Sequence, residues 1–151
     1  MPHEYRKGFK PMCRVFTNKI VLETDGGFAV ENITQQVVDA VHQSGINQGN
    51  VVVLYQHTTG AVVLDEYEAG IIVDLEEILD EIAPATRDYH HHLRAVDRNG
   101  WAHIRSALLG SSVTIPIGDG EPLLGRYQQV FILDMQVECE PRSIIIQVMG
   151  I

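Results

Sequence analysis

The chain has seven histidines in 151 residues, and three of them, His90, His91 and His92, are consecutive. Neighbouring side chains point in different directions in a helix or a strand, so three consecutive histidines cannot all converge on one metal ion. Two more histidines, His57 and His103, lie in separate segments. Three imidazoles from three elements are typical of a catalytic zinc site that leaves a fourth position open. The pattern predicts a metal centre, whereas the triplet taken alone would favour a solvated loop.

Carboxylates close to these histidines could orient a liganding imidazole or act as a general base. The candidates are Asp65, Glu66, Asp74 and Asp97. The sequence has no His-Glu-x-x-His motif, no phosphate-binding glycine loop and no Gly-x-Ser-x-Gly elbow. A bound phosphate would therefore have to be met by isolated groups such as Arg105, Arg126 or a helix N-terminus near Asn99.

The segments that carry these residues have recognisable secondary-structure patterns. Residues 51–55 and 61–66 are predicted strands, and the period of two puts His57 at a polar point between them. A helix is predicted over 99–109, where Trp101, Ile104 and Leu108 form an apolar stripe. Asn99, His103 and Ser106 share a different, polar stripe of that helix. We therefore expect His57 and His103 to be held by regular elements.

The rest of the chain alternates between strand and helix patterns. Residues 13–24 predict opening strands, and Asn32 with Gln35 resembles a capping box for a helix that ends at Gly45. Residues 69–83 form an amphipathic helix that we expect to dock on a sheet. A strand, a Gly-Asp-Gly turn, a long strand and a final strand follow. This order predicts an α+β fold with a mixed or antiparallel sheet and about three helices.

Composition limits the class of protein. The length suits one domain, 1–151, with 45% apolar and 21% charged residues. A net charge of −9 argues against nucleic acid as the main partner, and the apolar runs are too short to span a membrane. No apolar segment typical of a secretory signal follows the N-terminus, so we expect a cytoplasmic protein. Cys13 and Cys139 are expected to be buried, reduced thiols.

Three sequence blocks together resemble the YjbQ-like proteins, a family described as secondary thiamine-phosphate synthases. They are QHTTGAVVLDE (56–66), YHHHLRAVDRNGWAHIRSALLG (89–110) and SVTIPIGDGEPLLGRYQQV (112–130). In the first block Gly60 stands where the family has Ala, Asp65 where it has Asn, and Glu66 keeps the acid. In the second, His92 stands where Asn or Asp is usual. In the third, Arg126 and Tyr127 replace Thr and Trp.

The resemblance implies an α+β fold that assembles as a homotrimer with a metal-compatible histidine cluster. Its metal ligands would be His57, His91 and His103, for zinc or, with a phosphorylated substrate, magnesium. Glu66 and Asp97 would be the catalytic residues. The implied substrate-binding residues are Thr58, Thr59, Asn99, Ser112 and Gln128, and Arg105 joins them as an isolated group that could meet a phosphate.

The implied activity is weak condensation of a hydroxymethylpyrimidine pyrophosphate with a thiazole phosphate, which releases pyrophosphate. The ligand would then be a small phosphorylated molecule. Two alternatives remain open from the sequence: a non-catalytic trimeric protein that binds a metal or a small ligand, and histidines that only satisfy a polar core.

Overall fold

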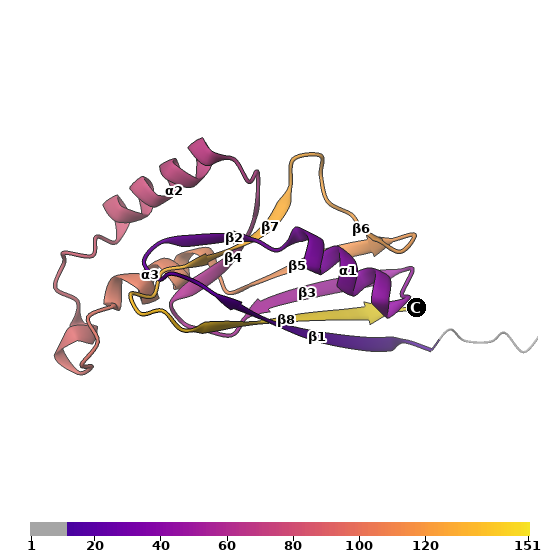
Figure 1. Ribbon diagram of the computed structural model, residues 1–151, viewed down its shortest axis with the longest axis horizontal. Coiled ribbons are helices and arrows are strands. Elements are labelled where there is room, and N and C mark those ends of the chain that lie inside the picture. The colour runs from indigo at the N-terminus through magenta and orange to yellow at the C-terminus, as the bar shows by residue number, and fades with distance from the viewer. Residues whose placement is uncertain (1–11) are drawn as a thin grey trace, which may run out of the picture.

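Two antiparallel sheets form the frame of the molecule in the computed structural model, which describes residues 12–151 (Figure 1). The larger sheet has the strand order β1-β8-β3-β5-β6 and the smaller one β2-β7-β4. The strands are β1 (Arg14–Glu23), β2 (Ala29–Asn32), β3 (Gly49–Tyr55), β4 (Gly60–Asp65), β5 (Ser112–Gly118), β6 (Glu121–Pro122), β7 (Gln129–Asp134) and β8 (Pro141–Gly150). The helices are α1 (Thr34–Ser44), α2 (Ala69–Ile82), the short 3-10 helix η1 (His90–Leu93) and α3 (Gly100–Leu109). The predicted α+β class is confirmed.

The long strand β8 organises the larger sheet because it pairs on both sides. Its register with β1 runs from Arg14 opposite Gly150 to Glu23 opposite Pro141. On its other side it pairs with β3, where the last pair is Tyr55 with Ile144. Ser143, which precedes Ile144 on β8, therefore lies next to the segment that leaves β3 and carries His57.

The main core lies between the two sheets and α1. The buried apolar side chains come from both sheets and this helix: Ile33, Val37, Ala40, Val41, Val51, Val53, Val62, Ile115, Val130, Ile132, Ile144, Ile146 and Val148. The predicted cap at Asn32 is wrong by one residue, because Ile33 precedes the first helical residue, Thr34; Oδ1 of Asn32 accepts the N–H of Thr34 at 3.0 Å, and Gly45 ends the helix with φ 61°. Gln35 does not complete a capping box, because its amide donates to Asp39 instead.

Helix α2 was expected to dock on a sheet, and this prediction is wrong. It projects from the body of the molecule (Figure 1), and Leu79 is its only buried residue. Leu79 joins a small second core with Trp101, Ala102 and Met135. The end of α2 is tied to α3 by Arg105, which lies there rather than in a binding site.

Two further predictions differ from the structure. The long strand expected after the Gly-Asp-Gly turn is split into β6 and β7, because the intervening loop turns where the N–H of Gly125 donates to Oε1 of Gln128 at 2.8 Å. Cys13 and Cys139 are free thiols, but both are exposed rather than buried. Among residues 12–151, none of the helices combines the length and apolar character needed to cross a membrane.

Candidate metal centre and adjoining clefts

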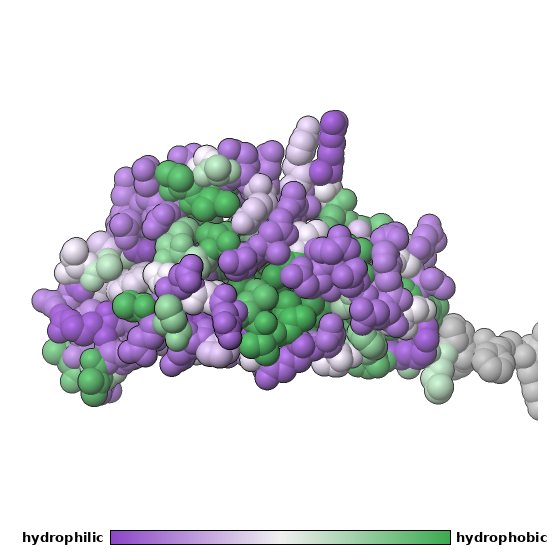
Figure 2. Space-filling model, in the orientation of Figure 1, coloured by the Kyte–Doolittle hydropathy of each residue, from purple (hydrophilic) through white to green (hydrophobic). Residues whose placement is uncertain are grey.

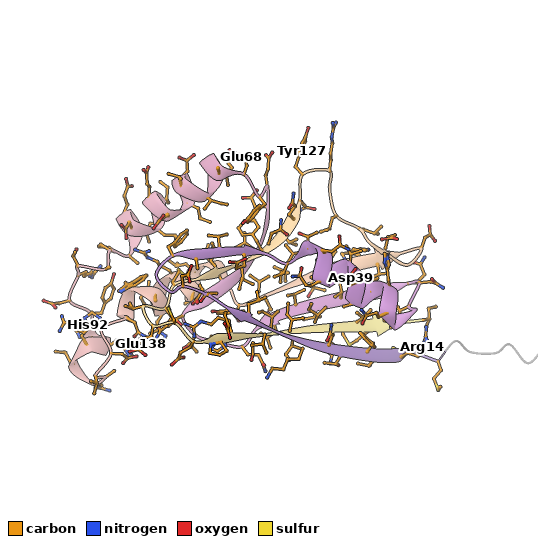
Figure 3. All side chains as sticks on the ribbon, viewed as in Figure 1. Arg14, Asp39, Glu68, His92, Tyr127 and Glu138 are labelled. Atoms are coloured by element: carbon orange, nitrogen blue, oxygen red, sulfur yellow. The ribbon has the colours of Figure 1, made fainter. Side chains whose placement is uncertain are left out.

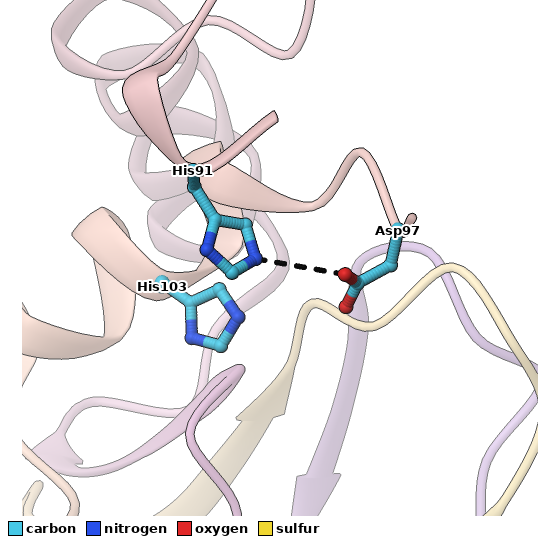
Figure 4. A group of neighbouring side chains, drawn as sticks. All are labelled: His91, Asp97 and His103. Atoms are coloured by element: carbon cyan, nitrogen blue, oxygen red, sulfur yellow. Dashed lines mark ion pairs between the residues drawn. The ribbon is translucent and has the colours of Figure 1, made fainter. Parts of the chain in front are cut away.

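Three side chains from one continuous stretch of chain form the candidate metal centre. His91 lies in η1, Asp97 lies in the following loop, and His103 lies on the first turns of α3. One potential ligand atom from each residue lies within 4.8 Å of the others. Figure 4 shows the imidazoles of His91 and His103 beside each other, with the Asp97 carboxylate next to His91. The fold therefore brings together two of the three histidines predicted as ligands.

The geometry within this group is close. Nε2 of His91 lies 3.7 Å from Oδ1 of Asp97, and the ring centroids of His91 and His103 are 4.7 Å apart at an interplanar angle of 63°. Imidazole nitrogen and carboxylate oxygen are ligands that zinc accepts in catalytic sites. The donor set suits a divalent metal ion.

Two buried polar atoms at this site have no hydrogen-bond partner among the described residues. They are Nε2 of His91 and Oδ1 of Asn99. Asn99 is 4% exposed, and its amide nitrogen donates to Oε1 of Gln136 at 3.0 Å, which leaves the oxygen free. Buried polar groups are nearly always paired, so these two atoms are candidates for contact with a bound ligand.

His57 lies close to the centre but is engaged differently. It follows β3, and its Nε2 accepts the backbone N–H of Ser143 at 3.0 Å. Burial, with a further contribution from the positive charge of Arg142, lowers the pKa of His57 below its ordinary value of 6.5. The structure does not bring His57 into the group formed by His91, Asp97 and His103.

Two clefts meet at this point and share a wall. One, of about 320 Å³, is lined by Gln56, His57, Thr58, Thr59, Asp97, Asn99, His103, Gln136, Glu140 and Arg142. The other, of about 370 Å³, is lined by His57, Thr58, His103, Ser106, Ala107, Gly110 and Ser111. His57, Thr58 and His103 belong to both. We call these the polar cleft and the α3 cleft.

A buried ionic network supports the floor of the polar cleft. Nε of Arg142 donates to Oδ2 of Asp134 at 2.7 Å, and the two side chains are 1% and 0% exposed. The same carboxylate accepts the hydroxyls of Tyr55 and Thr24. Burial and the adjacent Asp134 raise the pKa of Tyr55 above its ordinary value, so its hydroxyl stays protonated and donates.

The three consecutive histidines, His90, His91 and His92, have different environments. His90 is exposed, as expected for a solvated residue. His92 has a structural role, because its Nε2 accepts the N–H of Gly100 at 3.2 Å at the start of α3. Only His91, the middle member, faces the candidate centre.

The predicted substrate-binding residues fall into two groups. Thr58, Thr59 and Asn99 line the polar cleft. Arg105 does not: it is 3% exposed, its Nε donates to the carbonyl of Ala83 at 3.0 Å, and its guanidinium pairs with Asp80. Arg105 therefore anchors α2, and the structure does not bring it to the clefts.

Glu66 and Gln128 lie at the other end of the smaller sheet. Glu66 comes directly after β4, roughly 20 Å along the strand from its cleft end at Gly60. Gln128 comes just before Gln129, which pairs with Asp65 at that same end. Figure 3 shows nearby Glu68 and Tyr127 on one side of the molecule, away from His92 and Glu138. Within one chain, these predicted residues are not brought to the candidate metal centre.

Ser112 is intermediate between these groups. It is the first, exposed residue of β5, and it pairs with Leu54 beside the α3 cleft without lining it. The adjacent Ser111 does line that cleft.

Sequence reasoning missed Gln136, Glu140 and Arg142 in the polar cleft. Arg142 had a signal, because an arginine at the start of the apolar stretch Ile144–Ile146 must be paired if it is buried. Asp134, at the end of the apolar strand β7, was the matching carboxylate. The two lie eight residues apart, on either side of the loop that joins β7 to β8.

Comparison with known proteins agrees with the fold and the motifs. A family model described as "UPF0047 protein YjbQ-like" matches residues 18–151. A UPF0047 protein from Methanothermobacter thermautotrophicus is 32% identical over 121 residues, which cover 80% of this chain and 83% of the relative. A UPF0047 protein from Synechocystis is 30% identical over 133 residues, which cover 87% of this chain and 89% of the relative.

Solved structures give the same answer. The crystal structure of a YbjQ-like protein of unknown function from Sulfolobus solfataricus has a TM-score of 0.88 and 28% identity, covering 93% of this chain and 100% of that one. A hypothetical protein from Aeropyrum pernix has a TM-score of 0.84 and 27% identity, covering 90% and 99%. The chain therefore belongs to the YjbQ-like, UPF0047 family of proteins.

Proposed function

We propose that this protein is a metal-dependent transferase acting on small phosphorylated molecules, with the metal ion held by His91, Asp97 and His103. The observation that carries this proposal is the buried Nε2 of His91, which has no hydrogen-bond partner in the described part of the chain and lies beside a second imidazole and a carboxylate. The ion, with zinc the best match to nitrogen and carboxylate ligands, would offset negative charge that develops on a leaving pyrophosphate.

The two clefts support a reaction between two substrates. Each is within the volume range of small-molecule sites, and both border His103. In the polar cleft, the hydroxyl of Thr58 and the unpaired Oδ1 of Asn99 are placed to orient a ligand. This arrangement fits the condensation of a hydroxymethylpyrimidine pyrophosphate with a thiazole phosphate, with one substrate in each cleft.

Metal analysis tests the centre directly. Untagged protein is dialysed against zinc, and zinc per chain is measured by mass spectrometry for the wild type and for His91→Ala, His103→Ala and His90→Ala. The wild type and the His90→Ala control, whose imidazole is exposed, should retain zinc, while the other two variants should lose it. Equal zinc content in all four proteins would refute the centre.

The activity is tested by following thiamine phosphate formed from its two precursors. The wild type should show a rate above background that His103→Ala abolishes. Glu66→Gln should keep the wild-type rate if the reaction is completed within one chain, because Glu66 lies at the far end of β4. A rate in His103→Ala equal to that of the wild type would contradict the proposal.

A second candidate is a non-catalytic protein that binds a metal or a small ligand. The observation that favours it is the position of the predicted general bases: Asp97 is engaged beside His91, and Glu66 is remote within one chain. Metal retention together with no formation of thiamine phosphate above background would support this alternative.

We also propose that the protein assembles with further copies of itself, as a homotrimer. Support comes from α2, whose apolar side chains Ile71, Ile78 and Ile82 share one side of the helix and remain 37%, 51% and 56% exposed. Figure 2 shows apolar residues on the surface where α2 runs in Figure 1. Exposed apolar surface of this kind marks contact sites. Light scattering should give a trimer for the wild type and a smaller species for Ile78→Glu.

A further inference from the structure

The hydrogen bonds around His57 determine which of its nitrogens carries the proton. The N–H of Ser143 donates to Nε2 at 3.0 Å, and the carbonyl of Ser143 accepts the N–H of Gln56 at 3.0 Å. Both backbone groups of Ser143 are thus used by consecutive residues of one segment. The imidazole continues the β3–β8 pairing beyond its last residue pair, Tyr55 with Ile144.

An imidazole nitrogen that accepts a hydrogen bond carries no proton. In a neutral imidazole the proton must then be on the other nitrogen, so Nδ1 of His57 is an N–H donor. A protonated nitrogen cannot ligate a metal, and Nε2 has its lone pair directed at Ser143. In this geometry neither nitrogen of His57 is available as a metal ligand.

The surroundings keep the ring in this state. Arg142, the residue before Ser143, is held by the buried carboxylate of Asp134, so the backbone that donates to His57 has a fixed position. Burial of the ring and, after it, the positive charge of Arg142 lower the pKa of His57 and so disfavour a second proton. Nδ1 has no hydrogen-bond partner among the described residues and is not among their buried unpaired atoms. It is therefore accessible to a ligand, on a residue that lines both clefts.

The position of this donor suits an oxygen-rich ligand. His57 and His103 both belong to the wall shared by the two clefts, so a group held at the metal centre can extend toward Nδ1. Among the described residues that line the polar cleft, Arg142 is the only permanent cation, and its Nε is committed to Asp134. An anion in this cleft therefore needs neutral donors as well as the metal ion.

We propose that His57 is not a third metal ligand but a neutral hydrogen-bond donor, whose Nδ1–H binds a phosphate oxygen of the substrate and whose tautomer is set by the Ser143 amide. This inference rests on the proposed function for the identity of the ligand. The assignment of the tautomer and the exclusion of His57 from the metal site follow from the hydrogen bonds alone.

Two substitutions separate the two nitrogens. The amide nitrogen of asparagine occupies nearly the place of Nδ1, so His57→Asn keeps a donor facing the clefts. The longer His57→Gln places its amide at Nε2, where its oxygen can accept from Ser143, and leaves no donor at Nδ1. Neither variant supplies an imidazole, so both would lose a metal ion that His57 ligates. Thermal melting of both variants controls for folding.

Three readouts apply to the wild type and the two variants: zinc per chain, pyrophosphate affinity by calorimetry with zinc present, and the tautomer by ¹⁵N NMR of labelled histidine. We expect Nδ1–H in the wild type and unchanged zinc in both variants. Pyrophosphate should bind about 10- to 100-fold more weakly to His57→Gln, the loss of one hydrogen bond to a charged group, and with a smaller loss to His57→Asn.

Loss of zinc from both variants, a proton on Nε2, or equal pyrophosphate affinity in all three proteins would overturn the inference. Failure of the proposed metal centre has a different signature. The wild type itself would bind no zinc, while the NMR spectrum would still show whether the Ser143 amide sets the tautomer of His57.

Discussion

Replacing Arg142 by methionine should destabilise the protein strongly, because it removes the cation that pairs with a buried carboxylate, the only such cation in residues 12–151. Arg142 and Asp134 are 1% and 0% exposed, and Nε of the arginine lies 2.7 Å from Oδ2 of the aspartate. In the variant this oxygen keeps only the Thr24 hydroxyl, and Oδ1 keeps the donors Tyr55 and Gln136. Hydrogen bonds from neutral groups do not replace the lost charge.

The expected cost follows from the burial of the pair. Breaking a buried ion pair by removing one partner costs about 3–5 kcal/mol, a large share of the roughly 5–15 kcal/mol that stabilises a typical domain. The double variant Arg142→Met with Asp134→Leu removes both charges and should recover most of this loss. Equilibrium unfolding in urea measures the free energy of unfolding of each protein.

An exposed pair in the same chain provides the matched control. Arg98 lies 3.0 Å from Asp88, but the two side chains are 69% and 95% exposed. Arg98→Met should therefore change the free energy of unfolding by less than about 1 kcal/mol. The description of a buried ion pair would be refuted if Arg142→Met lowered the free energy of unfolding no more than Arg98→Met. It would also be refuted if the double variant were less stable than Arg142→Met alone.

Three further outcomes are expected. Gly60→Ala should lower the free energy of unfolding by about 1–3 kcal/mol, because an added Cβ would lie 2.3 Å from the ring of Tyr55 and 2.5 Å from the carbonyl oxygen of Leu133. A negligible loss in urea unfolding would contradict this. The pKa of His57 is lower in the folded state than its ordinary value of 6.5, so the unfolded state binds this proton more readily as the pH falls. The free energy of unfolding should therefore decrease from about pH 7 to about pH 5 by more in the wild type than in His57→Asn. Parallel pH profiles of the two proteins would show that His57 is not responsible. Zinc at 100 times its dissociation constant should stabilise the wild type by about 2.7 kcal/mol and His103→Ala far less. Thermal melting measures both gains, and equal gains would argue against the metal centre.

Much of the architecture was predictable because it depends on local patterns. The alternation of Val51, Val53 and Tyr55 identified β3, and the polar stripe with Asn99 and His103 identified the face of α3 that borders the polar cleft. His91 meets His103 because only a short loop joins their two elements. Sequence-local information was therefore sufficient for the two histidines of the candidate metal centre.

The remaining features depend on pairings between distant segments. The state of His57 is decided by Ser143, which is 86 residues away and adjacent only through the register of β3 with β8. Arg105 resembled a phosphate ligand in the sequence, but its place on α3 points it to Ala83 and the end of α2. The apolar stripe of α2 correctly indicated an amphipathic helix, but within residues 12–151 no sheet covers that stripe.

The wall shared by the two clefts links their binding free energies. His57, Thr58 and His103 line both spaces, so a ligand that moves any of them on one side changes the shape and the donors presented on the other. Such coupling is reciprocal: whatever factor the first ligand imposes on the affinity of the second, the second imposes on the first. If each cleft holds one ligand, as proposed, substitutions at these shared residues should change both dissociation constants together.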